Sequence, residues 1–139
     1  EMLRSLVGSE MCIRDRIKHM VEDLNMNVEI IGCPIIREAD GLAKSSRNTY
    51  LSAEERKAAL ILSKSINLGR KMVEDGETDT GVITKAMTDL INTEPLAKID
   101  YVKAVDGITI RPVAKVKKPM LVAIAVYIGK TRLIDNFMI

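Results

Sequence analysis

The chain is organised around residues 37–50, which read Arg37-Glu38-Ala39-Asp40-Gly41-Leu42-Ala43-Lys44-Ser45-Ser46-Arg47-Asn48-Thr49-Tyr50. A short apolar run at 28–34 precedes this stretch, and a helical pattern begins after it at Ser52. We therefore predict a loop between a strand and a helix. Within it, Asp40 and Gly41 favour a tight turn, because glycine adopts positive φ at little cost.

The side chains of this loop suit the binding of a polyphosphate. Arg37, Lys44 and Arg47 are cationic, and Ser45 and Ser46 add two adjacent hydroxyls. A guanidinium binds two phosphate oxygens at once, an ammonium acts as a mobile point charge, and hydroxyls complete the ring of donors. From these residues alone an ordinary polar surface loop is an equally good interpretation, because Lys-Ser-Ser-Arg is a short motif.

Upstream of the loop, apolar residues recur at helical spacing: Ile17, Met20, Val21 and Leu24. This spacing predicts a helix that ends near Asn25. Residues 28–33 are rich in β-branched side chains and are followed by Pro34, which predicts a buried strand. A helix, a strand and then a polar loop are typical of the last part of a doubly wound α/β sheet.

Downstream of the loop, the pattern predicts two helices. Ser52 and Glu55 form a capping box, and the helix that it starts is expected to run to residue 74 or 75. A second helix is predicted from Thr80, and Pro95 prevents its continuation. Charged residues near the start of the first helix are expected to face solvent: Glu54, Arg56 and Lys57.

The last third of the chain is predicted to be β. Residues 99–106 alternate between core and surface types, and residues 120–128 are almost continuously apolar. Gly129 and Lys130 form a turn into residues 131–136, which predicts an antiparallel hairpin. Two helices on a small antiparallel sheet make an α+β domain.

Composition excludes several classes of protein. Hydrophobic residues make up 47% and charged residues 29% of the chain, which favours a soluble globular domain over disorder. The net charge of +2 gives no reason to expect nucleic acid, and the densest basic group, Lys115-Val116-Lys117-Lys118, is interpreted as a solvated turn. Cys12 and Cys33 lack metal-ligand spacing, so we predict no metal site in the protein and a reducing, cytoplasmic location. No apolar run reaches the roughly 20 residues of a membrane helix, so no membrane partner is expected.

The full string from residue 37 continues as Leu51-Ser52-Ala53-Glu54-Glu55-Arg56, and it follows Gly32-Cys33-Pro34-Ile35-Ile36. Near the end the chain reads Thr131-Arg132-Leu133-Ile134-Asp135-Asn136. Together these stretches resemble the pantothenate synthetases, the pantoate:β-alanine ligases, over about residues 17–139. That family is similar in architecture to class I aminoacyl-tRNA synthetases, and residues 37–50, here named the phosphate loop, resemble their mobile Lys-Met-Ser-Lys-Ser loop.

The resemblance implies an organisation in three parts. Residues 17–50 are expected to be the end of a Rossmann-like, ATP-binding nucleotidyltransferase domain, an α/β remnant that includes the phosphate loop. Residues 51–139 are expected to form a small C-terminal α+β lid, a helical hairpin on an antiparallel sheet. Residues 1–16 do not resemble the family and are interpreted as non-native sequence joined to the authentic continuation.

The resemblance also implies a function. Pantoate and ATP, with Mg²⁺, would give pantoyl adenylate and pyrophosphate, and β-alanine would then give pantothenate and AMP. Ser45, Ser46 and Arg47 are expected to hold the phosphates, Ile36 to contact adenine, and Lys44 to contact the nucleotide where many relatives have methionine. No residue of this chain is predicted to be catalytic, and the intact enzyme is expected to be a cytoplasmic homodimer.

Two parts of the family's site have no counterpart in this sequence. The His-x-Gly-His motif is absent because His19 is the single histidine, and the chain has no glutamine to bind pantoate. We therefore expect a C-terminal fragment with half a site, inactive alone. Two alternatives stay open: a noncatalytic phosphate-binding or interaction module, and another adenylyl-transfer enzyme of the same superfamily.

Overall fold

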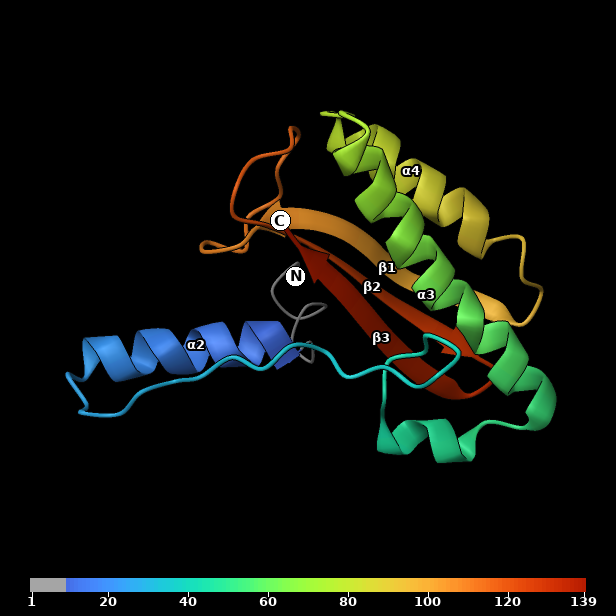
Figure 1. The fold of residues 1–139 in the computed structure, drawn as a ribbon, viewed down its shortest axis with the longest axis horizontal. Coiled ribbons are helices and arrows are strands. Elements are labelled where there is room, and N and C mark those ends of the chain that lie inside the picture. The colour runs from blue at the N-terminus through green and yellow to red at the C-terminus, as the bar shows by residue number, and fades with distance from the viewer. Residues whose placement is uncertain (1–9) are drawn as a thin grey trace. The chain divides into compact units, whose positions relative to one another are not determined.

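The computed structural model describes residues 10–139, with residues 10–15 described as helix only (Figure 1). The interpretation of 1–16 as non-native therefore falls largely on residues outside the described part of the chain. Contacts between residues divide the chain into two compact units, 1–35 and 36–139. Each unit is described by itself.

The described residues of the first unit form one helix, α2 (Glu10–Asp23), followed by an extended segment. The helix ends close to the expected position, but it begins seven residues before Ile17. The predicted strand at 28–33 is wrong: these residues have no strand structure, and Val28 and Ile31 are 53% and 75% exposed. A β-branched run forms a buried strand only beside partner strands, and the described residues of this unit supply none. The expected α/β sheet is thus not observed among residues 10–35.

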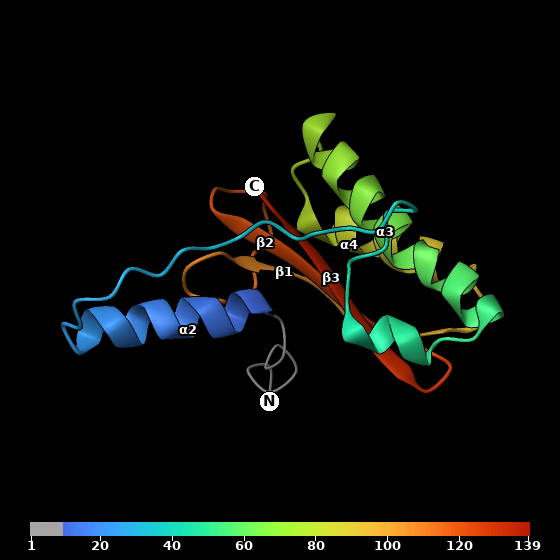
Figure 2. The same cartoon turned by 60° about the horizontal axis from the view of Figure 1, so that its bottom comes forward.

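The second unit is built on a three-stranded antiparallel sheet in the order β1-β2-β3. The strands are β1 (Ala97–Asp106), β2 (Met120–Ile128) and β3 (Thr131–Met138). Two helices, α3 (Ala53–Glu74) and α4 (Thr80–Ile91), lie on the same face of this sheet in both views (Figures 1 and 2). The α+β part of the predicted fold is therefore confirmed.

Alternation along β2 explains why the helices cover this face. Every second residue of β2 enters the core that α3 and α4 share with the sheet: Met120, Val122, Ile124, Val126 and Ile128. Each is fully buried. Burying side chains of this size stabilises a fold by about 1.5–3 kcal/mol each. The pairing of Ile128 with Thr131 closes the hairpin at Gly129, whose φ of 58° suits glycine.

The capping box of α3 is present as predicted. Ser52 Oγ accepts a hydrogen bond from the Glu55 backbone N–H at 3.2 Å, and the Glu55 carboxylate accepts one from the Ser52 N–H at 2.8 Å. Two backbone donors at the start of the helix are thereby satisfied. The phosphate loop consequently leads into a helix with a fixed first turn.

Replacing Ser52 by alanine should lower the free energy of unfolding by about 1 kcal/mol, because one of these donors loses its acceptor. Urea unfolding of the full chain measures the change. The matched control is Ser46→Ala, since no hydrogen bond of the Ser46 hydroxyl is found among the described residues. Equal stabilities of the two variants would contradict the capping role.

The lysines of the basic group at 115–118 are exposed, as predicted, and two of them also form ion pairs. Lys117 forms an ion pair with Asp106, and Lys115 lies 3.5 Å from Asp79. The Asp106 carboxylate also accepts from the backbone N–H groups of Ile108 and Thr109, at 2.9 and 2.8 Å. The ion pair with Lys117, followed by these hydrogen bonds, holds the pKa of Asp106 well below its usual range.

Asp106 should therefore make stability depend on pH. A carboxylate whose pKa is lower in the folded state stabilises the fold above its unfolded pKa of about 4, and this contribution is lost as pH falls through the folded pKa. Asp106→Asn should thus be less stable than wild type in urea at pH 7, and the difference should shrink progressively below pH ~4. A difference that stays constant down to pH ~2 would contradict the assignment.

None of the helices in the described part of the chain is long and apolar enough to cross a membrane.

Candidate functional site

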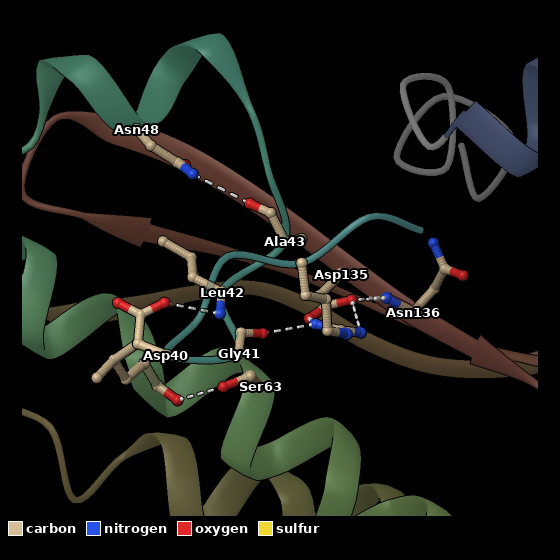
Figure 3. A network of polar contacts seen from close by, with 10 residues as sticks. Asp40, Gly41, Leu42, Ala43, Asn48, Ser63, Asp135 and Asn136 are labelled. Carbon is tan, nitrogen blue, oxygen red and sulfur yellow. Dashed lines mark hydrogen bonds and ion pairs between the residues drawn. The ribbon is translucent and has the colours of Figure 1, made fainter. Parts of the chain in front are cut away.

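The first half of the phosphate loop folds into a tight turn. Arg37 and Ala43 form an isolated antiparallel bridge, and Gly41 has the positive φ, 90°, that the sequence predicts for this position. The Leu42 N–H donates to Asp40 Oδ1 at 3.2 Å, and the Leu42 side chain is buried in the core (Figure 3). The turn is thus anchored by one apolar side chain and by its own hydrogen bonds.

A second anchor joins the turn to strand β3. The Arg37 guanidinium binds both carboxylate oxygens of Asp135, at 2.7 and 2.9 Å, and also donates to the Gly41 carbonyl at 3.0 Å (Figure 3). The Asp135 side chain is 0% exposed and the Arg37 side chain 29% exposed. The Asn136 N–H donates to Asp135 at 2.8 Å.

This pairing changes the role expected of Arg37. The hydrogen bond to Asp135, together with the attraction between the two charges, raises the pKa of Arg37 despite the opposing effect of burial. The guanidinium counted above among the cationic donors is therefore occupied by a buried carboxylate. Arg37 holds the loop in place, and Lys44 and Arg47 remain as its cationic donors.

The second half of the loop contains a short 3-10 helix, η1 (Ser46–Tyr50), which the sequence did not predict. Ser45 caps it by accepting from the Arg47 N–H at 3.2 Å. The Asn48 amide nitrogen donates to the Ala43 carbonyl at 3.1 Å (Figure 3) and also to Glu38 Oε1 at 2.8 Å. The Asn48 side chain thus links the two ends of the segment 44–47, because it follows this segment and binds the residue that precedes it.

Two carboxylates of the loop are bound by the first turn of α3. Arg56 Nη2 lies 2.7 Å from a carboxylate oxygen of Glu38 and 2.7 Å from one of Asp40. The expectation that Arg56 faces solvent is therefore wrong. The loop is held to β3 by the ion pair of Arg37 with Asp135 and to α3 by the two ion pairs of Arg56.

An open depression of about 510 Å³ lies beside this network. Its lining consists of Glu38, Lys44, Ser45, Ser46, Asn48, Thr49 and Arg56. Three of the five predicted nucleotide-binding residues are thus brought together there. Ile36 and Arg47 do not line it, and Ile36 is 71% exposed. Among the described residues, no ion pair involves Lys44 or Arg47, so both cations are available to an anion.

The described residues contain no group of three or more histidine, cysteine, aspartate or glutamate side chains that could hold a metal ion. Near the loop, the two carboxylates Glu38 and Asp40 are already bound to Arg56. The chemistry of the depression is therefore that of cationic and hydroxyl donors.

Fold and loop together define a small α+β domain that presents a cationic, hydroxyl-rich loop beside a helical hairpin. A family model described as pantoate-beta-alanine ligase matches residues 14–138. The chain belongs to this family.

Curated relatives agree with this assignment. The pantothenate synthetase of Ruminiclostridium cellulolyticum is 62% identical over 121 residues, which are 87% of this chain and 43% of the relative. That of Clostridium acetobutylicum is 63% identical over the same shares. The chain thus spans less than half the length of these relatives.

Solved structures match the fold as well. Pantothenate synthetase from Thermus thermophilus superposes with a TM-score of 0.83 at 33% identity, over 89% of this chain and 45% of that one. Pantoate-beta-alanine ligase from Francisella tularensis superposes with a TM-score of 0.55 at 28% identity, over 88% and 38%. The latter was crystallised in complex with beta-gamma ATP and beta-alanine.

Proposed function

We propose that this chain supplies the phosphate-binding half of an ATP-dependent ligase that condenses pantoate with β-alanine to pantothenate. The observation that carries the proposal is the depression at the phosphate loop, where Lys44, Ser45 and Ser46 converge and no ion pair among the described residues occupies the lysine. Membership of the pantoate-beta-alanine ligase family supplies the substrates.

In the first step, a carboxylate oxygen of pantoate attacks the α-phosphorus of ATP. The bond from that phosphorus to the bridging oxygen breaks, and pyrophosphate leaves with the electron pair. Negative charge grows on the leaving group, so donors aimed at its oxygens stabilise the transition state. We assign this role to Ser45, Ser46, Arg47 and Lys44, and contact with adenine to the exposed side chain of Ile36.

In the second step, the amine of β-alanine attacks the acyl carbon of pantoyl adenylate. The bond to the phosphate oxygen breaks, AMP leaves, and the nitrogen loses a proton. Neither step requires a protein nucleophile. This chain's residues would act by holding and orienting phosphate groups.

Mg²⁺ would fit this site only through the substrate. The described residues offer no carboxylate cluster, and Glu38 and Asp40 are bound to Arg56. Magnesium at nucleotide sites is commonly held largely by phosphate oxygens and water. We therefore assign no residue of this chain to the metal. A cytoplasmic, homodimeric full-length enzyme completes the proposal, as the family resemblance implies.

The test restores the remainder of the site. A hybrid protein would join the part of the Ruminiclostridium cellulolyticum enzyme that precedes the matched region to residues 17–139 of this chain. The hybrid should release AMP only when ATP, pantoate and β-alanine are all present, and the 139-residue chain alone should release none.

Two outcomes would overturn the proposal. AMP release by the chain alone would show that the half-site description is wrong. A folded hybrid that releases AMP with another acid but not with pantoate would place the chain with a different adenylyl-transfer reaction.

A further inference from the structure

Two carboxylates lie at the base of the phosphate loop, where an anionic ligand is expected. Glu38 lines the same depression as Lys44, Ser45 and Ser46, and Asp40 shares the ion-pair partner of Glu38. Without a partner, carboxylates beside this depression would repel a polyphosphate or form ion pairs with the loop's own cations. A cation that pairs with both carboxylates would prevent this repulsion and so allow the loop to bind phosphate.

Arg56 is placed to do this. Its Nη2 atom lies 2.7 Å from oxygens of both Glu38 and Asp40, and its backbone N–H donates to the Ser52 carbonyl at 2.8 Å within the capped first turn of α3. The Asn48 amide, which donates to the other oxygen of Glu38, brings no charge. Arg56 is thus the one cation bound to this pair of carboxylates among the described residues.

The other terminal nitrogen of the Arg56 guanidinium, Nη1, makes no competing hydrogen bond with the described residues. Arg56 Nη1 is buried and has no hydrogen-bond partner in the described part of the chain. A buried donor without a partner costs about 1–3 kcal/mol, which the short charge-assisted hydrogen bond to Glu38 and the ion pair with Asp40 must offset. The position of Arg56 therefore depends on Glu38 and Asp40.

We propose that Arg56 is a positioning residue of the phosphate site: it neutralises Glu38 and Asp40 and so leaves Lys44 and Arg47 free to bind the phosphates. This inference rests on the phosphate-binding role in the proposed function, but not on pantoate as the substrate. It assigns Arg56 no contact with the ligand.

The test titrates the full 139-residue chain with inorganic tripolyphosphate and follows the backbone amide resonances of Ser45, Ser46 and Arg47. Arg56→Gln should raise the Kd about tenfold, because two carboxylates become unpaired beside the anion. The matched control is Lys57→Gln, which removes the same charge from the next, exposed residue of α3 and should leave Kd within about twofold.

A rescue variant separates charge from folding. Glu38→Gln/Asp40→Asn/Arg56→Gln removes both carboxylates along with the arginine, so its Kd should return to near the wild-type value. The effect of Arg56→Gln should also shrink in 1 M salt, where the Debye length is about 3 Å. Thermal unfolding of each variant checks that it is folded.

The inference is overturned if wild type does not bind tripolyphosphate, if Arg56→Gln binds as tightly as Lys57→Gln, or if the triple variant binds as weakly as Arg56→Gln. None of these results depends on pantoate. Failure of the proposed ligase reaction appears separately, in the AMP release of the hybrid protein.

Discussion

Replacing Arg37 by methionine should lower the free energy of unfolding of this chain by about 3–5 kcal/mol. The substitution leaves the Asp135 carboxylate, whose side chain is 0% exposed, without its cation. The Asn136 N–H remains as a hydrogen-bond donor to it, but a single neutral donor cannot replace a bidentate guanidinium. Urea unfolding at pH 7 measures the loss.

Two further variants make this result specific. Asp135→Asn should cost less than Arg37→Met, because Arg37 is 29% exposed and its charge can be hydrated. Arg111→Met, at an exposed arginine with no ion pair among the described residues, should change stability by less than about 0.5 kcal/mol. If Arg37→Met unfolded like Arg111→Met, the clamp between the loop and β3 would not be a stabilising contact.

Replacing Arg47 by alanine should reduce the kcat/KM of the hybrid ligase for ATP by about 10²–10³-fold. Arg47 lies at the start of η1, is exposed and has no ion pair in the described part of the chain. Its guanidinium is therefore free to stabilise the negative charge that develops on the leaving pyrophosphate. The substitution of Arg47 breaks no internal ion pair between described residues. Initial rates of AMP release at varied ATP give the value.

The control for this kinetic prediction is Arg111→Ala, which removes an equal charge from the β1–β2 connection. Its kcat/KM should stay within about twofold of the unsubstituted hybrid, as expected for a screened surface charge. A fall of the same size in both variants would point to net charge, and no fall with Arg47→Ala would remove that residue from the site.

Local sequence signals predicted most of the second unit. The capping box at Ser52, the helical spacing that follows it and the apolar run of β2 each act within a few residues, so the sequence reveals them directly. The turn at Gly41 was predicted for the same reason. The side chains within such elements determine where the elements begin and end.

Features that depend on distant partners were not predicted. The pair of Arg37 and Asp135 joins residues 98 positions apart, and no periodic pattern marks either of them. Arg56 has the spacing of a solvent-facing helix residue, yet it binds two loop carboxylates. The strand expected at 28–33 was wrong because burial of a strand is decided by its neighbours.

The nucleotide-binding residues predicted from the family are only partly brought together. Lys44, Ser45 and Ser46 share one depression, whereas Ile36 and Arg47 lie outside it. Their proposed roles follow from the family and from their exposure.

The central claim is that this chain provides the phosphate-binding half of a pantoate-activating site. The most direct measurement is the exchange of labelled pyrophosphate into ATP by the hybrid protein, because exchange isolates the adenylation step. The account predicts exchange that requires pantoate, needs no β-alanine and falls steeply with Arg47→Ala. Exchange that proceeds without pantoate, or that is indifferent to Arg47, would contradict it.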